Sequence, residues 1–356
     1  MYKSLSSRAG VRLFVLSDIP STKLVGENDS VHDNSSAIGR FFRIVKSLVV
    51  GRGVVYEFYN NRQAVEKFLD AEISCSKFYD AVYVERLPIF LYEERMRKLS
   101  NFIVFDCVDS FSRQVKLFRK VSKGWKRMVY ILESLVIKRV ERLSCDSADL
   151  VLVTTEAEKK YLNEYVGVES KVVPCMHATN VPENMPYVPL TERDKYFSFH
   201  GKLTYLPNML ALDELNKLGG AVKIKVAGAA DKGTIGKDSN LEFMGFVDDL
   251  YGHLSGALGS FFPISFCVGI QNKVVESLAA GTPVFITPEI EESFPMNSNS
   301  YRDRCYFVVE RWDLPSLEEC INKMKSLGDV PYIEARKMYS EYFVGDDVMR
   351  CLGLYE

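Results

Sequence analysis

The first half of the chain alternates short apolar, β-rich runs with longer stretches of helical periodicity. The runs predict strands at 11–16, 53–59, 80–85, 101–109, 148–155 and 171–175. Strands that alternate with helical stretches are typical of βαβ units, which build a parallel sheet. Ligands of open α/β folds bind at the carboxyl ends of such strands. Asp106 and Asp109 lie at one of these predicted ends.

The second half repeats this alternation after a proline-rich break. Residues 180–192 carry three prolines and no apolar period, which is typical of a linker. The strands predicted beyond it are 195–201, 221–228, 240–247, 257–265, 282–287 and 305–310. We therefore predict an N-terminal domain over 1–180, a linker over 181–194, a second α/β domain over 195–330, and C-terminal helices over 331–356 that pack back on the first domain.

Composition adds limits to this picture. A length of 356 residues favours two domains with a cleft between them. A charged content of 26% and a formal charge of -2 describe an ordinary globular protein, with no global bias toward nucleic acid. The eight cysteines include no C-x-x-C pair and do not cluster with the histidines, so we predict neither a zinc site nor a disulfide framework, and we expect a reducing cytoplasm. We expect no secretory signal and no membrane span.

A predicted helix from about 271 to 280 carries the most specific chemistry. It follows a glycine turn and ends at Gly281, because a glycine after a helix supplies a left-handed stop. Asn272, Lys273 and Glu276 share one face, at spacings of three and four. The free N–H groups at the helix start and the lysine would form an anion site, with Glu276 about a turn further in. A phosphate and a ribose diol fit this arrangement, but by local chemistry Glu276 could equally be a solvated helix acid.

Three segments of the second half carry a resemblance to a known family. They are "FSFHGKLTYLPNMLAL", "LEFMGFVDDL" and "FFPISFCVGIQNKVVESLAAGTPVFIT", in this order and spacing. Together they resemble the C-terminal domain of group 1, family-four-like glycosyltransferases of the GT-B fold. "YDAVYVER" at 79–86 and "FDCVDSFS" at 105–112 resemble the branch that serves bacterial polysaccharide synthesis. The resemblance covers nearly the whole chain and implies an α/β fold of GT-B architecture, with two Rossmann-like domains facing across a cleft.

The resemblance also implies a donor site in the second domain. Glu276 matches the acid that holds the ribose hydroxyls, a role that suits a carboxylate because it accepts two hydrogen bonds from a vicinal diol. Gly201 and Lys202 match the Gly-Arg pair of many members, with a point charge in place of the bidentate fork. The other residues implied for the phosphates or the base are Phe246, Val247, Gly269, Ile270, Gln271 and Lys273.

Two positions depart from the family pattern. The first acid of the family's E-x7-E motif falls on Val268, and the second lysine of its diphosphate site falls on Pro207. We infer that Lys273 supplies the missing charge. Since Val268 cannot accept hydrogen bonds, we expect this site to hold the nucleotide in the family's way and to recognise the donor sugar by other contacts.

Catalytic residues are harder to assign. Retaining members place a histidine after an N-terminal strand, whereas this chain has Asp106 and Asp109 there, and we take both as catalytic candidates. Asp109 could be a general base, an anchor for a sugar hydroxyl, or an N-cap or turn residue. His200 lies beside Gly201 and is either a cleft residue that contacts substrate or a core or loop histidine. No D-x-D element lies at a strand end of the donor half, so we expect neither a metal nor another cofactor.

One segment has a strong local charge. Residues 113–143 contain ten Lys and Arg against Glu133 and Glu141, a net of +8, with aromatic and apolar residues interleaved. Such a segment fits a peripheral contact with an anionic membrane, where a lipid-linked acceptor would be presented. The alternative is a solvated helix pair with an ordinary core face.

These features predict a cytoplasmic glycosyltransferase that associates with the inner face of the plasma membrane. It would transfer a sugar from a nucleotide-sugar donor to a glycan acceptor that is lipid-linked, with retention of configuration as the family's usual outcome and no nucleic-acid partner. Two alternatives stay open: a sugar-nucleotide epimerase of the same fold, and a non-catalytic protein that binds nucleotide sugars.

Overall fold

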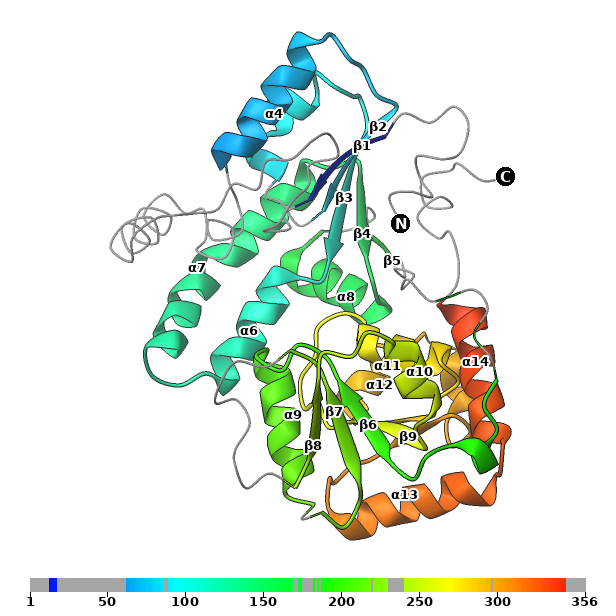
Figure 1. Ribbon diagram of the computed structural model, residues 1–356. Helices are drawn as coiled ribbons and strands as arrows, with labels where there is room; N and C mark the ends of the chain where they lie inside the picture. The colour runs from blue at the N-terminus through cyan, green and yellow to red at the C-terminus, as the bar shows by residue number, and fades with distance from the viewer. Residues whose placement is uncertain are drawn as a thin grey trace. The chain divides into compact units, whose positions relative to one another are not determined.

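The structure, a computed structural model, divides into two compact units. The first unit comprises residues 1–175 with 347–356, and the second comprises residues 176–346. The residues described are 13–17, 62–85, 89–168, 172–174, 182, 185, 187–218, 220–229, 240–295 and 297–343. Each unit is built on one parallel sheet with helices packed against it (Figure 1).

The first unit contains five described strands in the order β1-β2-β3-β4-β5, all paired in parallel. The strands are β1 (Leu13–Ser17), β2 (Ala81–Glu85), β3 (Ile103–Val108), β4 (Leu150–Val153) and β5 (Val172–Pro174). The helices are α4 (Arg62–Ser74), α5 (Glu93–Met96), α6 (Phe111–Val121), α7 (Gly124–Asp146) and α8 (Glu156–Tyr161), with short turns η1 (Ile89–Leu91) and η2 (Leu162–Val166). Helices α6 and α7 pack closely against each other.

The second unit contains six described strands in the order β11-β10-β9-β6-β7-β8, again all parallel. The strands are β6 (Phe197–His200), β7 (Ile224–Ala227), β8 (Glu242–Gly245), β9 (Gly259–Phe262), β10 (Val284–Ile286) and β11 (Tyr306–Val308). The helices are α9 (Leu206–Asn216), α10 (Leu250–Ser255), α11 (Asn272–Ala279), α12 (Pro288–Glu291), α13 (Leu314–Ser326) and α14 (Val330–Tyr342), with short turns η3 (Leu190–Glu192) and η4 (Ser298–Tyr301).

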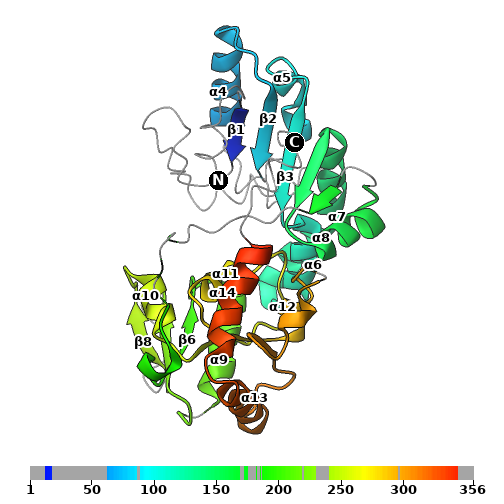
Figure 2. The ribbon, with the colours of Figure 1, turned by 90° about the vertical axis from the view of Figure 1, so that its right-hand side faces the viewer.

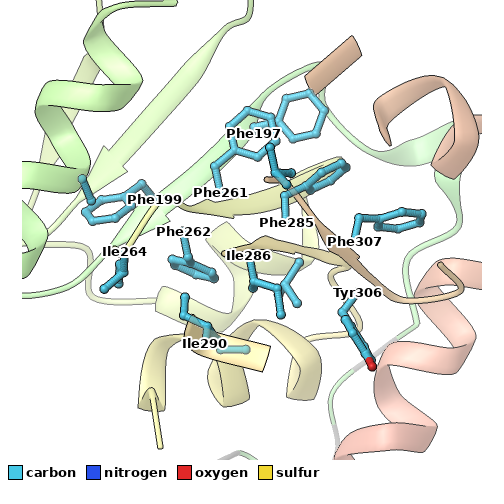
Figure 3. Packing of buried hydrophobic residues seen from close by; sticks show 14 of the residues in the cluster. Phe197, Phe199, Phe261, Phe262, Ile264, Phe285, Ile286, Ile290, Tyr306 and Phe307 are labelled. Carbon is cyan, nitrogen blue, oxygen red and sulfur yellow. The ribbon is translucent and has the colours of Figure 1, made fainter. Parts of the chain in front are cut away.

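Aromatic side chains fix the centre of the second sheet. The parallel register places Phe261 opposite Phe285 and Phe285 opposite Phe307, so three rings form a row across β9, β10 and β11 (Figure 3). Phe197 of β6 stacks on Phe261 with ring centroids 4.2 Å apart. Gly259 leaves room for these rings, because a Cβ there would lie 2.9 Å from a ring carbon of Phe285. Buried aromatic pairs of this kind stabilise a fold beyond their area alone.

The predicted elements agree well with those observed. Every strand predicted in the second half is present with slightly shorter bounds, and α11 confirms the helix predicted at 271–280. In the first half, the strand predicted at 53–59 lies outside the described residues. Helix α14 lies beside α11 in both views of the second unit (Figures 1 and 2). The rest of the segment predicted to return to the first domain, 344–356, lies outside the described residues, and that return stays a prediction.

Candidate donor site in the second unit

Two glycine turns shape the carboxyl ends of β6 and β7. β6 ends at His200 and β7 ends at Ala227, and the glycines that follow, Gly201 and Gly228, have φ values of 139° and 148°. Side chains disfavour this backbone region. The N–H of Gly201 donates to the Ala227 carbonyl at 3.1 Å. A Cβ on Gly228 would lie 1.9 Å from the Gly201 carbonyl oxygen, so glycine allows the two turns to approach closely.

The N-terminal end of α11 carries no side-chain cap among the described residues. The helix starts after a turn in which Gly269 has a φ of 62°, and its buried side consists of Val274, Val275 and Leu278. Within the described residues, its first turn holds no acid and its N-cap residue, Gln271, makes no capping bond through its side chain. Helix N–H groups without such partners bind water or a ligand, and the helix dipole favours an anion there.

Glu276 is held by a histidine from the neighbouring strand. Its Oε2 lies 3.0 Å from Nε2 of His200, which is the last residue of β6. The His200 side chain is 4% exposed, whereas that of Glu276 is 26% exposed. Burial lowers the pKa of His200, and the neighbouring Glu276 offsets only part of this effect. The pair is therefore a neutral imidazole bonded to a carboxylate that still reaches solvent.

Lys273 lies one turn before Glu276 on α11 and is mostly buried. Its Nζ donates to the side-chain oxygen of Asn208 in α9 and lies 5.4 Å from the ring centroid of Phe199. Burial lowers the pKa of Lys273 to about 8. The Asn208 amide nitrogen in turn donates to the Lys202 carbonyl at 2.8 Å. A cation bonded to a neutral amide is poised to accept an anionic partner.

The remaining predicted donor residues differ in exposure. The Lys202 side chain is exposed, and Ile270 packs partly against the apolar core. Phe246 follows β8 and is 79% exposed, while Val247 beside it is half-buried. An exposed ring gains apolar burial when a planar ligand covers it, so Phe246 is suited to contact a base.

Three features of this site escaped the sequence reasoning: the His200–Glu276 bond, the anchoring of Lys273 by Asn208, and the close approach at Gly228. Asn208 directly follows Pro207, where the family pattern has its second lysine, and that position was the available signal. The bond between His200 and Glu276 joins residues 76 positions apart, and no local pattern in the sequence reports it.

The two acids predicted as catalytic lie in the first unit, at the end of β3. Asp106 is fully buried: one carboxylate oxygen accepts the Tyr83 hydroxyl and the other accepts the N–H of Val108 at 3.0 Å. Val108 has a φ of 56°, and the β3–β4 register shifts between Asp106 and Val108. Asp106 thus supports a β-bulge, and this placement does not favour the catalytic role predicted for it.

Asp109 is half-buried and directly precedes α6. The N-cap of that helix is Ser110, whose side chain accepts the N–H of Arg113, so the capping role considered for Asp109 belongs to its neighbour. The Asp109 N–H donates to the Cys107 carbonyl at 2.6 Å within the turn.

Two buried carboxylates hold the turn that starts α6. Glu158 of α8 accepts the N–H of Ser110 at 2.9 Å and pairs with Arg113. Glu141 of α7 accepts the hydroxyl of Ser112, and burial raises the pKa of Glu141 to about 7. In the sequence, Glu141 is recognisable only as a charge within the basic segment, because a helix acid looks the same there whether it is buried or solvated.

The basic segment 113–143 forms most of α6 and α7. Their shared apolar contact is Phe111, Val115, Ile137 and Val140. On α7, Met128, Leu132, Leu135 and Arg139 are exposed and recur at spacings of four, three and four, so they share one face. Leu135 is 73% exposed. In the part of the chain that the structure describes, no helix is both long and apolar enough to cross a membrane.

Several solved structures share this fold at low sequence identity. HepE of Anabaena, solved with UDP-glucose, has a TM-score of 0.58 and 12% identity, over 97% of this chain and 100% of HepE. Sucrose-phosphate synthase from Thermosynechococcus elongatus has a TM-score of 0.59 and 15% identity, over 82% of this chain and 77% of the synthase. A glycosyltransferase from Rickettsia africae has a TM-score of 0.52 and 11% identity, over 91% of this chain and 83% of that one.

The sequence itself matches no protein-family profile and no curated protein. The fold class is therefore defined by three-dimensional similarity: an α/β protein with two Rossmann-like domains on parallel sheets. More narrowly it has the GT-B architecture, which confirms the fold implied by the resemblance.

Proposed function

We propose that this protein is a glycosyltransferase that takes a sugar from a nucleotide-sugar donor. The observation that carries this proposal is the arrangement on α11, where a helix N-terminus without a side-chain cap, a buried lysine and a partly exposed carboxylate follow one another along one helix. These groups suit a diphosphate and a vicinal diol, the two polar parts of a sugar nucleotide. HepE shares the fold and was solved with UDP-glucose, which supports the same ligand class here.

Each donor residue then has a role. Glu276 accepts the ribose hydroxyls, and Lys273 with the helix N-terminus neutralises the diphosphate, assisted by the backbone of Gly269, Ile270 and Gln271. Gly201 allows the diphosphate to approach the backbone, and exposed Lys202 adds a point charge. Phe246 and Val247 lie beside the base. Stabilisation of the leaving diphosphate is the main contribution of this site to catalysis.

On the acceptor side we propose Asp109 as the residue that contacts the reacting sugars. It is half-buried and lies on a turn held by two buried carboxylates, whereas both oxygens of Asp106 are bonded within the fold. We propose transfer with retention, in which Asp109 anchors a sugar hydroxyl. Proton NMR of the product distinguishes the outcomes: an inverted anomeric configuration would instead make Asp109 a general base.

We propose a lipid-linked glycan as acceptor and an anionic membrane surface, on the cytoplasmic side, as the place of reaction. The exposed face of α7 carries Met128, Leu132 and Leu135 among the lysines and arginines of a segment with a net charge of +8. Apolar side chains insert at the headgroup level while basic ones pair with anionic lipid.

Vesicle cosedimentation tests the membrane proposal. Vesicles with phosphatidylglycerol should bind the protein, and the bound fraction should fall as salt is raised. Leu132→Ser with Leu135→Ser should release the protein, whereas Ile333→Ser, at another exposed apolar position on α14, should not. Binding that is the same on neutral vesicles, or unchanged in the double variant, would rule this surface out.

A donor panel tests the central proposal. Thermal shifts with UDP-, GDP-, ADP- and dTDP-sugars should identify at least one donor that stabilises the wild type, because a ligand of the folded state raises its melting temperature. Glu276→Gln should lose most of that shift. Glu318→Gln, an exposed acid on α13, makes the same charge change away from the site and should keep it. A panel in which no donor stabilises the protein would refute the proposed glycosyltransferase function.

Product analysis then separates the alternatives. A transferase forms a glycoside on an added acceptor together with a free nucleotide. An epimerase would convert the donor without an acceptor-linked product, and a binding protein would show a thermal shift without turnover.

A further inference from the structure

His200 and Glu276 form one hydrogen-bonded unit that joins a strand end to a helix. His200 is the last residue of β6 and Glu276 lies in the middle of α11, with 3.0 Å between Nε2 and Oε2. The imidazole is almost completely buried, whereas about a quarter of the Glu276 side chain is exposed. The inner part of the pair is thus fixed by packing and the outer part is open to a ligand.

The protonation state of the histidine follows from its surroundings. Its other ring nitrogen, Nδ1, is buried and has no hydrogen-bond partner among the described residues. With the proton on Nε2, the ring donates to the carboxylate and Nδ1 carries a lone pair. With the proton on Nδ1, a buried N–H would lack an acceptor and the Nε2 lone pair would face an anion. The first tautomer is therefore strongly favoured.

A carboxylate that accepts this bond through one oxygen still has lone pairs free for a ligand. Rotation of the Glu276 side chain would break the bond with His200, so the bond selects one orientation. A vicinal diol requires two acceptor positions in a fixed geometry, and a preorganised carboxylate binds it without losing side-chain freedom.

We propose that His200 is a positioning residue that fixes the Glu276 carboxylate for a vicinal ribose diol, so that recognition of ribonucleotides depends on the His200–Glu276 pair and not on Glu276 alone. This inference rests on the proposed nucleotide-sugar site. It adds that the site distinguishes ribose from deoxyribose, and that the buried histidine controls this distinction.

The charged and titratable groups around His200 set the pH range in which the His200–Glu276 pair can position a diol. Glu276 and Lys273 come from α11, and His253 of α10 interacts electrostatically with it. Burial and Lys273 both disfavour the imidazolium, so the ring is neutral at pH 7.5. In acid, a charged ring would pair more tightly with Glu276 and compete with the diol.

A purely structural bond between strand and helix is the alternative. Loss of such a bond would lower stability and weaken ribose and deoxyribose ligands equally. The ratio of the two affinities therefore separates the two roles, because a general loss of stability leaves that ratio unchanged.

The experiment measures dissociation constants by calorimetry for UDP, GDP, ADP and their 2′-deoxy forms at pH 7.5. The wild type should prefer a ribose form by about tenfold or more, the effect of one hydrogen bond to a charged group. Glu276→Gln should lose most of this preference. His200→Phe should lose it to a similar degree, while His200→Gln should retain it, because its amide can donate from the position of Nε2.

His253→Gln is the matched control, since His253 of α10 is a partly buried histidine. It bonds to Ser198, which lies on β6 together with His200. This variant should keep the wild-type preference. If His200→Phe does not fold, the pH arm decides: because burial lowers the pKa of His200, the preference should fall only as the pH is taken below the ordinary imidazole value of 6.5 in the wild type, and stay constant over the same range in His200→Gln.

Three results have distinct meanings. A ribose preference intact in His200→Phe, or equally pH-dependent in His200→Gln, overturns the positioning role while the proposed function stands. A wild type that binds ribose and deoxyribose forms equally also overturns it. A wild type that binds none of the six nucleotides overturns the proposed function and this inference together.

Discussion

Lys273 combines a buried position with a neutral hydrogen-bond partner. Its ammonium group donates to the Asn208 amide oxygen, and burial lowers its pKa to about 8. A bound diphosphate would favour the charged form and raise this pKa again. The affinity for the ligand must then depend on whether the lysine is already charged before binding.

We expect UDP to bind about tenfold more weakly at pH 9 than at pH 7. One unit above a pKa of about 8, roughly one tenth of the lysine remains charged in the free protein, so binding must supply the missing proton. Calorimetric titration at both pH values measures the change. Lys273→Gln should bind UDP weakly at both pH values, and Lys325→Gln, at an exposed position of α13, should keep the tenfold difference in affinity. A tenfold difference that survives in Lys273→Gln would arise from another titrating group.

Glu141 presents the opposite case in the first unit, since burial raises its pKa to about 7. Between its unfolded value of 4.5 and this value, the folded protein binds more protons than the unfolded protein, so this group lowers stability as pH rises through that window.

Glu141→Gln should therefore stabilise the protein at pH 8 by up to about 3 kcal/mol and change little at pH 5. Urea unfolding at the two pH values measures this difference. Glu156→Gln, an exposed acid at the start of α8, should show no comparable gain. An equal loss of stability at both pH values would instead mean that the bond from Ser112 outweighs the buried charge.

At the scale of the element, the ends of β6 and β7 depend on two backbones that pass close together. Glycines with positive φ follow both strands, and the Gly201 carbonyl occupies the space where Gly228 would carry a side chain. The same short loop after β6 leads into Lys202, whose carbonyl anchors Asn208 and through it Lys273. A displacement of this loop would therefore reach the diphosphate site.

Gly228→Ala should lower the free energy of unfolding by roughly 2–4 kcal/mol and weaken UDP binding at the same time. Gly328→Ala is the matched control, because Gly328 also has a positive φ but a Cβ there meets nothing within 4 Å. Gly328→Ala should lower the free energy of unfolding by about 1 kcal/mol, through the backbone conformation alone, and should leave UDP binding unchanged. Equal losses of stability at the two positions would contradict the close approach of Gly228 to the Gly201 carbonyl.

The sequence allowed most elements to be predicted, because each is marked locally. Strand β7 shows strict alternation, and α11 is bounded by glycines at both ends. Contacts between distant elements carry no such mark. An aspartate at a strand end, such as Asp106, looks the same in the sequence whether a tyrosine binds it or a substrate does, so its catalytic role stays a prediction.

At the scale of the whole molecule, each of the two units has its own buried core. The proposed donor residues all come from the second unit, whereas Asp109 and α7, the helix proposed to contact a membrane, belong to the first. Binding a nucleotide therefore contributes directly to the stability of the second unit.

We expect scanning calorimetry to resolve two unfolding transitions, one for each unit. UDP should raise the midpoint temperature of the transition that belongs to the second unit. At one hundred times its dissociation constant, the ligand should add about 2.7 kcal/mol to that transition. Gly228→Ala should lower the same transition, and Glu141→Gln should change the other at pH 8. A single transition that responds to all three would show that the units unfold together.

The neutral partner of Lys273 also has a consequence for turnover. When the glycosidic bond to the donor breaks, the released nucleoside diphosphate carries one more negative charge than the sugar nucleotide had. In the proposed reaction, Lys273, whose hydrogen-bond partner among the described residues is a neutral amide, would hold that additional charge well, so departure of the spent nucleotide would become the slow step. The enzyme would then be sensitive to accumulated nucleoside diphosphate, and would work best beside a reaction that hydrolyses it or phosphorylates it again.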